Sequence, residues 1–263
     1  AYNRRASAEG ETRKAIDVLW PTMERLGLSD GADPDRLRFT TSIKDALHDA
    51  DFVQECGPED AELKINLYAE LDEAAEPHIV IASSTSGIPM TTIQQRCKNP
   101  ARCIVGLPYT PPYLIPVVEV VSGTQTAPEV TDWAMAFYKA MGKRPIRIKK
   151  EVPGFIANRL LESLWREALH MVADGQATVE QIDLAISHGF GMRWAIFGPF
   201  MVYHLGGGKG GIAHFLDHFA PALKLPWTHM EAPELTQELR DRVVQGTLDE
   251  AAGRTIQDLE KER

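Results

Sequence analysis

Residues 78–87 read HIVIASSTSG, a continuous apolar run that ends in small polar residues. A short run of this kind is typical of a buried strand, and the polar residues after it predict a turn. Further short runs in the first half predict strands at residues 38–40, 51–55, 104–106, 116–121 and 146–148. Apolar residues recur every three or four positions in the segments that predict helices, residues 7–27, 60–75 and 128–141. Strands that alternate with helices predict a parallel or mixed sheet with helices on both faces.

The second half of the chain has a different pattern. From Phe155 onward no segment has the character of a strand. Residues 155–174 predict a long helix, Thr178 is a good N-cap for the next one, and residues 233–262 are charged and helical in pattern. The change falls at EVPG and predicts two domains, residues 1–151 and 152–263.

The composition argues against several classes of protein. The 263 residues are 44% hydrophobic and 25% charged, with a formal net charge of −9. An acidic surface repels phosphate backbones, so we expect no nucleic-acid partner. No apolar run approaches the roughly 20 residues that span a membrane. Cys56, Cys97 and Cys103 form no CxxC pair, so we expect no disulfide framework, no metal site and a cytoplasmic location.

Three segments carry a more specific signal: SSTSG at residues 83–87, GLPYTPPYLIPVVEVV at 106–121 and VPGFIANRL at 152–160. In this order and spacing they resemble the L-3-hydroxyacyl-CoA dehydrogenase superfamily. Within it the likeness is greatest to the L-carnitine dehydrogenase branch, and the lambda-crystallin/gulonate dehydrogenase branch comes second. Three C-terminal stretches also resemble the carnitine branch: GPF at 198–200, YHL at 203–205 and LPWT at 225–228.

The resemblance implies an α/β Rossmann-type fold, a doubly wound sheet, followed by an all-helical domain. Residues 1–151 would then bind a dinucleotide, and residues 152–263 would bind substrate and form a homodimer. The implied reaction is the NAD-dependent oxidation of the 3-hydroxyl of a small hydroxy acid, with L-carnitine oxidised to 3-dehydrocarnitine as the first candidate.

The resemblance also assigns site residues. In such enzymes a histidine on an HPxNPP-type turn removes the hydroxyl proton, and a glutamate twelve residues further on orients its imidazole. This chain has Leu107 and Glu119 at those positions. Ser86 and Asn158 match the serine and asparagine that bind the substrate oxygen, although each is also a common helix-capping residue. The cofactor positions are Glu59, Lys64 and Ser86 near the nicotinamide and Asn3 near the ribose.

Leu107 is the first departure from the family pattern. Leucine cannot accept a proton, and general acid–base catalysis contributes about 10²–10⁴-fold. The change is therefore expected to add about 3–5 kcal/mol to the barrier and to leave Glu119 facing an apolar side chain without a partner. At the position where the family has an asparagine on this turn, the chain has Thr110. Among the histidines of the chain, His204 is the one candidate to replace the catalytic histidine. The favoured interpretation is that His204 is instead a hydrogen-bonded residue between helices.

The second departure is the phosphate-binding motif. The family begins with a strand, GxGxxG and a helix, and no GxGxxG occurs here. We expect the chain to begin at the end of the second strand, truncated by roughly 30 residues, the span of a βα unit plus a strand. Asn3 replaces the acid that favours NAD, and Arg4 and Arg5 beside it would tolerate NADP. The glycine-rich run at 206–211 predicts an interhelical loop and not a P-loop.

Two substrate classes compete. A CoA thioester needs basic residues near its entrance, but residues 4–36 hold six basic and seven acidic side chains. A zwitterion such as carnitine fits better, because aromatic faces bind a quaternary ammonium. The candidate aromatic residues, each of which core packing would also explain, are Tyr109, Tyr113, Trp194, Phe197, Phe200 and Tyr203, with Arg193 for a carboxylate. A catalytically impaired or non-catalytic relative that binds a small ligand, and a 3-hydroxyacyl-CoA dehydrogenase, are the alternative functions.

Overall fold

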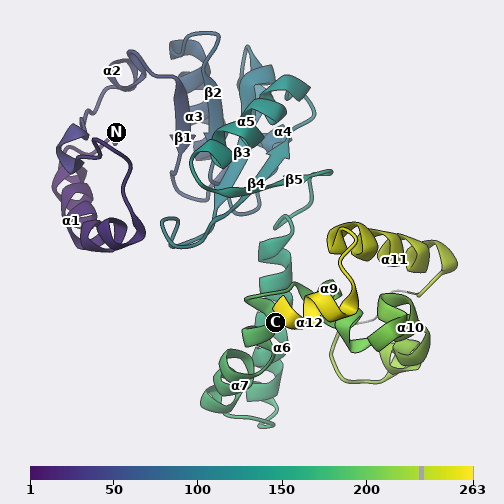
Figure 1. The fold of residues 1–263 in the computed structure, drawn as a ribbon. Coiled ribbons are helices and arrows are strands. Elements are labelled where there is room, and N and C mark those ends of the chain that lie inside the picture. Colours follow the sequence, from purple (N-terminus) through teal and green to yellow (C-terminus); the bar gives the residue numbers. More distant parts are fainter. Residues whose placement is uncertain (231–233, 263) are drawn as a thin grey trace. The chain divides into compact units, whose positions relative to one another are not determined.

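A computed structural model describes residues 1–230 and 234–262. The chain divides into a unit formed by Ala1–Leu161 and a second unit that starts at Glu162. The first contains a sheet with helices around it, and the second is helical (Figure 1). The predicted fold class, a Rossmann-type sheet followed by helices, is confirmed.

The sheet has five strands in the order β1-β2-β3-β4-β5. Their bounds are Phe52–Glu55, Val80–Ser83, Cys103–Pro108, Val117–Ser122 and Arg144–Ile148. Strands β3 and β4 are antiparallel, and every other neighbouring pair is parallel. The short connection 109–116 joins β3 to β4 as a hairpin-like return, whereas helices α3 (Ala61–Ala74) and α5 (Pro128–Ala140) make the crossovers between parallel strands. The sheet is therefore mixed.

Side chains on the sheet alternate between two apolar layers. Ile81, Val105 and Leu107 face a cluster that includes residues of α3, α2 (Ile43–Leu47) and α4 (Met90–Ile93). Their neighbours in sequence face a second cluster with α5, formed by Val80, Ala82, Ile104, Val118, Val120, Ala134 and Tyr138. Successive residues of a strand point to opposite faces, so strands buried on both faces are apolar throughout. This explains why β2 is visible in the sequence as an unbroken apolar run.

The predicted strand at 38–40 is not part of the sheet. Tyr2 and Thr40 form an isolated parallel bridge, in which Thr40 N–H donates to Ala1 O at 3.0 Å and Asn3 N–H to Thr40 O at 3.2 Å. These bonds join the segment to the start of the chain and leave no continuous ladder to β1, so the strand prediction is wrong here. Helix α1 (Ala8–Leu26) follows this start and lies on the β1 side of the sheet (Figure 1).

The second unit is built from helices around a small apolar core. Helix α6 (Ala157–Ala173) begins in the first unit, and the helices after it are α7 (Val179–Ala185), α8 (Gly191–Trp194), α9 (Pro199–Gly206), α10 (Gly211–Phe219), α11 (Gln237–Ala251) and α12 (Ile256–Glu262). Thr178 caps α7 as predicted, accepting from Gln181 N–H at 3.2 Å while the Gln181 side chain accepts from Thr178 N–H. The glycine-rich run forms a turn between α9 and α10, as expected. Residue 233 of the predicted C-terminal helical segment lies outside the described residues.

None of the helices in residues 1–230 and 234–262 is both long enough and apolar enough to cross a membrane.

A buried ion pair connects α3 to the start of β3. Arg102 donates to Asp72 Oδ1 from Nε at 3.0 Å and from Nη2 at 2.9 Å, and both side chains are almost fully buried. The second carboxylate oxygen of Asp72 accepts from the backbone N–H groups of Lys98 and Asn99. Because both side chains are buried and bonded to each other, removal of one partner would leave a buried charge uncompensated.

We therefore expect Arg102→Ala to lower the free energy of unfolding by about 3–5 kcal/mol. Arg96→Ala, which breaks an exposed pair with Glu62, is the matched control and should cost at most about 1 kcal/mol. Urea denaturation followed by circular dichroism measures both. Equal losses in the two variants would contradict the importance assigned to the buried pair.

Candidate active site

The antiparallel pairing of β3 with β4 places Leu107 directly opposite Glu119. Opposite residues of such a pair lie on one face of the sheet, with Cβ atoms about 4.5–5.5 Å apart. Leu107 is 6% exposed and Glu119 is 0% exposed. Any side chain at position 107 therefore lies beside the carboxylate of residue 119.

Glu119 is not isolated, which corrects the expectation that it lacks a partner. Its Oε1 accepts from Ile156 N–H at 2.9 Å and from Ala157 N–H at 3.1 Å, where α6 begins. Gly154 and Phe155 just before have φ values of 73° and 49°, so the chain turns there and directs these N–H groups at the carboxylate. A helix N-terminus favours a negative group, because its first N–H groups have no partner within the helix.

Tyr109 bridges Glu119 to Asn158. Its hydroxyl lies 3.4 Å from Glu119 Oε2 and 3.1 Å from Asn158 Oδ1. The Asn158 amide in turn donates to the backbone oxygen of Ser86 at 2.9 Å. Burial, followed by the charge of Glu119, raises the pKa of Tyr109, so its hydroxyl stays protonated at neutral pH. The single hydroxyl proton of Tyr109 serves either acceptor, and these polar contacts link four residues from distant parts of the sequence.

A second polar cluster lies at the carboxyl ends of β1 and β2. Lys64 Nζ is buried and donates to both carboxylate oxygens of Glu55, at 2.9 and 3.0 Å. Ser83 Oγ donates to Glu55 Oε2 at 2.6 Å. Glu59 lies 3.8 Å from Lys64, and its Oε1 accepts from Thr85 Oγ1 at 2.7 Å and from Ser86 N–H at 2.8 Å. Glu59 therefore fixes the turn that carries Ser86.

The structure brings together five of the residues expected from the sequence: Ser86, Leu107, Tyr109, Glu119 and Asn158. Ser86 is exposed, and the hydrogen bonds described for it come from its backbone, so its hydroxyl is open to a ligand. Thr110 is exposed and Tyr113 half-buried on the 109–116 connection. The Oδ1 of Asn3 accepts from Arg5 N–H at 3.0 Å.

The other expected substrate residues belong to the second unit, and most of them contact aromatic or apolar neighbours there. Phe197 is buried in a cluster with Met201 and Leu205. Trp194 and Tyr203 are exposed. The ring centroid of Trp194 lies 4.6 Å from that of Phe190, and the ring centroid of Tyr203 lies 4.6 Å from that of Phe215. Arg193 and Phe200 are exposed.

His204 is a hydrogen-bonded histidine between helices, the interpretation favoured from the sequence. It lies on α9, and its Nδ1 accepts from Ile212 N–H on α10 at 3.1 Å. Burial lowers the pKa of this imidazole.

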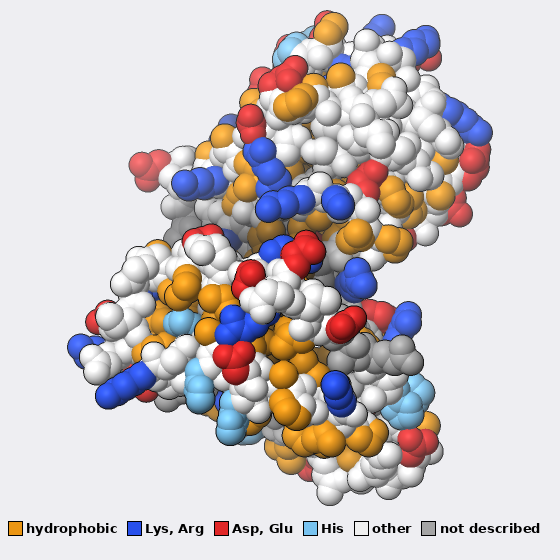
Figure 2. Space-filling view, turned by 90° about the vertical axis from the view of Figure 1, so that its right-hand side faces the viewer, with side chains coloured by type: hydrophobic (Ala, Val, Ile, Leu, Met, Phe, Trp, Pro, Cys, Tyr) orange, Lys and Arg blue, Asp and Glu red, His pale blue; other side chains and the backbone are white. Residues whose placement is uncertain are grey.

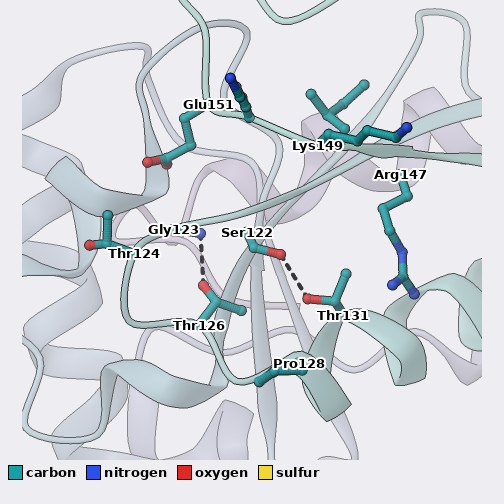
Figure 3. Close-up of a pocket in the computed structure, with 11 residues that line it drawn as sticks. Ser122, Gly123, Thr124, Thr126, Pro128, Thr131, Arg147, Lys149 and Glu151 are labelled. Atoms are coloured by element: carbon teal, nitrogen blue, oxygen red, sulfur yellow. Dashed lines mark hydrogen bonds between the residues drawn. The ribbon is translucent and has the colours of Figure 1, made fainter.

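A cleft of about 500 Å³ lies at the ends of β4 and β5 and the start of α5 (Figure 3). Hydrogen bonds across it join Ser122 to Thr131 at 2.7 Å and Gly123 N–H to Thr126 at 2.8 Å. Glu151 at its rim accepts from Thr91. Neither Glu119 nor Ser86 lines this cleft, so it is separate from the candidate site.

Sequence reasoning missed Glu55 and Ser83 as parts of the polar cluster. Both are polar residues at the last position of a buried strand. That position was a usable signal, because the carboxyl ends of neighbouring parallel strands meet at one edge of the sheet.

Comparison with known proteins shows the family of this chain. The NAD binding domain of 3-hydroxyacyl-CoA dehydrogenase matches residues 11–152, and the C-terminal domain of the same enzyme matches residues 154–255. The chain therefore belongs to the 3-hydroxyacyl-CoA dehydrogenase family.

Among the relatives of this chain is an L-carnitine dehydrogenase from Streptomyces coelicolor, 54% identical over 100% of this chain and 83% of that protein. One from Pseudomonas putida is 48% identical over 100% of this chain and 82% of its own length. Among solved structures, 5-formyl-3-hydroxy-2-methylpyridine 4-carboxylic acid 5-dehydrogenase, described as an NAD⁺-dependent dismutase, has a TM-score of 0.78 at 27% identity, covering 96% of this chain and 89% of that one. Mycobacterium tuberculosis FadB2 has a TM-score of 0.67 at 27% identity, covering 93% and 84%.

Glu119→Gln tests the link between the sheet and α6. Hydrogen bonds to a charged acceptor contribute more than those to a neutral one, so we expect the free energy of unfolding to fall by about 1–3 kcal/mol. Hydrogen exchange should accelerate at the amides of Ile156 and Ala157. Glu129→Gln, at an exposed position of α5, is the control and should change neither quantity. Unchanged exchange at the two α6 amides in Glu119→Gln would contradict this role of the carboxylate.

Proposed function

We propose that this protein is an NAD-dependent dehydrogenase that oxidises the 3-hydroxyl of L-carnitine to give 3-dehydrocarnitine. The observation that carries the proposal is identity of 48–54% over the whole chain to several L-carnitine dehydrogenases. The polar chain from Ser86 to Glu119 supports it, because it presents groups for a substrate oxygen at the edge of the sheet where ligands of such folds bind.

The residues present fit the nicotinamide end of the cofactor. Glu59 and Ser86 place a carboxylate and a hydroxyl at the carboxyl ends of β1 and β2, and a carboxamide needs both donors and acceptors. Lys64, whose buried ammonium donates to Glu55 and to Gly57 O, supports this end of the sheet. The GxGxxG motif that would hold the pyrophosphate does not occur in residues 1–263. We assign residues 1–151 to the dinucleotide domain and residues 152–263 to the substrate and dimerisation domain.

In this proposal the residues of the chain bind and orient the substrate. The hydroxyl of Ser86 and the amide of Asn158 hydrogen-bond the substrate oxygen, and Glu119 supplies the negative charge that stabilises a proton beside it. When bound, the nicotinamide accepts the hydride from the substrate carbon. Asn3 would contact the ribose when the cofactor is bound, and Arg4 and Arg5 beside it would accept the 2′-phosphate of NADP as the alternative cofactor.

Exposed groups of the second unit suit a zwitterionic substrate. Trp194, Phe200 and Tyr203 present aromatic faces to solvent, and such faces attract a quaternary ammonium by about 0.5–2 kcal/mol. Arg193 offers a partner for the carboxylate. Tyr109, Thr110 and Tyr113 are the proposed substrate contacts on the 109–116 connection of the first unit. Phe197, buried in the core of the second unit, supports the aromatic residues there.

Leu107 favours a second candidate function. A buried leucine beside Glu119 supplies no proton acceptor, so a relative that binds a small ligand without turnover is the alternative. A 3-hydroxyacyl-CoA dehydrogenase is a further alternative within the same family.

Leu107→His in the full-length natural protein distinguishes these functions. An imidazole facing Glu119 should raise kcat/KM for L-carnitine with NAD⁺ by about 10²–10⁴-fold. Leu107→Asn, which is polar but does not exchange protons at neutral pH, is the control and should give no such gain. NADH fluorescence titration shows whether each variant binds cofactor. Retained NADH and carnitine binding with no turnover in any variant would favour the non-catalytic alternative, and turnover of 3-hydroxybutyryl-CoA in place of carnitine would favour the CoA substrate.

Helix α6 suggests how two copies associate. Trp165, Leu169 and Val172 are exposed, and their spacing places them on one side of the helix. Hydrophobic side chains gather on the face of the helical unit that Figure 2 shows. Apolar side chains exposed along one side of a helix are typical of a protein–protein interface, and we assign this side of α6 to a homodimer.

Trp165→Glu should convert the dimer to a monomer at micromolar concentration, because a carboxylate in an apolar interface would be buried without a partner. Lys139→Glu, on the exposed surface of α5, should leave the dimer intact. Sedimentation velocity of the full protein measures both, and a natural protein that sediments as a monomer would contradict the assignment.

We also assign the protein to the cytoplasm. Cys97 and Cys103 lie with their sulfur atoms 3.9 Å apart as free thiols, which suits a reducing compartment.

A further inference from the structure

Leu107 leaves the proposed reaction without its usual proton acceptor, and the structure contains another hydroxyl beside Glu119. In the hydrogen-bonded chain that runs from Ser86 to Glu119, the titratable side chains are Tyr109 and Glu119. The Tyr109 hydroxyl contacts both the buried carboxylate and Asn158, the residue to which the proposed function assigns the substrate oxygen. It therefore lies between the group that would hold the substrate and the group that would store the proton.

We propose that Tyr109 is a catalytic residue of this protein, and that it passes the proton of the substrate hydroxyl to Glu119 in place of the histidine absent at position 107. The inference rests on the proposed function, because it concerns the same substrate oxygen.

The backbone explains why residue 109 lies on the same face of the sheet as residue 107. Residues two apart on a strand point to the same face, and Tyr109 N–H bonds to Val117 O at 3.4 Å, so the β3–β4 ladder continues one residue beyond Pro108. The ring of Tyr109 packs against the apolar cluster that contains Leu107. Both side chains thus lie on the face that carries Glu119, and only that of Tyr109 can exchange a proton.

The two oxygens of Glu119 have different surroundings. Oε1 accepts two backbone N–H groups at the start of α6, whereas Oε2 is the oxygen that faces the Tyr109 hydroxyl. Oε2 is therefore the atom available to receive a proton. Leu107 beside it is almost fully buried, and an apolar wall of this kind excludes water and strengthens the interaction between phenol and carboxylate.

The transfer balances in protons and electrons. The substrate O–H bond breaks, and its proton goes to the phenol oxygen of Tyr109. The phenol O–H bond breaks at the same time, and its proton goes to Glu119 Oε2. The electron pair of the substrate C–H bond leaves with its hydrogen to the nicotinamide dinucleotide, so the alcohol carbon is oxidised to a ketone and the nicotinamide is reduced. Tyr109 ends as a neutral phenol, in keeping with its raised pKa, and Glu119 ends as a carboxylic acid.

A double-mutant cycle between positions 107 and 109 tests this relay in the full-length natural protein. Tyr109→Phe removes only the hydroxyl, and we expect kcat with L-carnitine and NAD⁺ to fall at least about 10²-fold while KM changes little. In the Leu107→His background the imidazole takes the proton, so the same substitution should cost less than about tenfold. Tyr138→Phe, which removes a hydroxyl that donates to Gln54 on the other face of the sheet, is the matched control and should leave kcat unchanged in both backgrounds.

Each outcome of the cycle supports or overturns proton transfer by Tyr109. Equal losses from Tyr109→Phe in both backgrounds would show a positioning role and overturn it. An inactive natural protein that becomes active with Leu107→His would overturn the relay and support the proposed function. Inactivity of every variant, with NADH still bound, would overturn both.

A spectroscopic measurement covers the case in which Tyr109→Phe fails to fold, as judged by loss of NADH binding. On addition of L-carnitine and NAD⁺ to the natural protein, the infrared difference spectrum should gain the C=O stretch of a protonated carboxyl group. This band should be absent in Glu119→Gln. No such band in the natural protein would overturn the relay, because the proton would not end on Glu119.

Discussion

The fully buried carboxylate of Glu119 is the interaction on which the candidate site depends. A buried charge is costly unless hydrogen bonds compensate it. Here the compensation comes from two backbone N–H groups at the start of α6 and from the hydroxyl of Tyr109. One side chain of β4 therefore fixes both the first turn of α6, which carries Asn158, and the chain that follows β3. The site keeps its shape because the alternative is an unpaired charge in an apolar layer.

The carboxyl ends of β1 and β2 follow the same physical rule. Lys64 and Glu55 are both buried and neutralise each other, and Ser83 uses a remaining lone pair of the carboxylate. Glu59, which is partly exposed, then holds the backbone of the turn at Ser86. Buried charge thus fixes the loops on both sides of the place where a substrate oxygen would lie. Proteins commonly keep reacting groups rigid in this way, because a preorganised site does not have to reorganise during the reaction.

Local patterns predicted most of the fold, whereas contacts between distant residues escaped prediction. An unbroken apolar run located β2, an apolar run interrupted by Glu119 located β4, and Thr178 located the start of α7. The strand expected at 38–40 failed because strand pairing depends on a neighbour, which the pattern of a single segment does not reveal. Glu119 was expected to be unpaired because its main donors are backbone N–H groups 37 and 38 residues away. The residue types in a sequence do not indicate which backbone N–H groups will face a side chain. Tyr109 was interpreted only as an aromatic surface, since its ring is evident from the sequence and the partners of its hydroxyl are not.

The pairing of Leu107 with Glu119 is made by the backbones of β3 and β4 and not by the side chain at position 107. Leucine also packs well in the apolar layer that it faces. Selection that acts on folding or abundance alone would therefore not distinguish natural variants at this position. Two orthologues that differ here would be produced and purified in the same yield, and only selection on turnover would preserve one over the other.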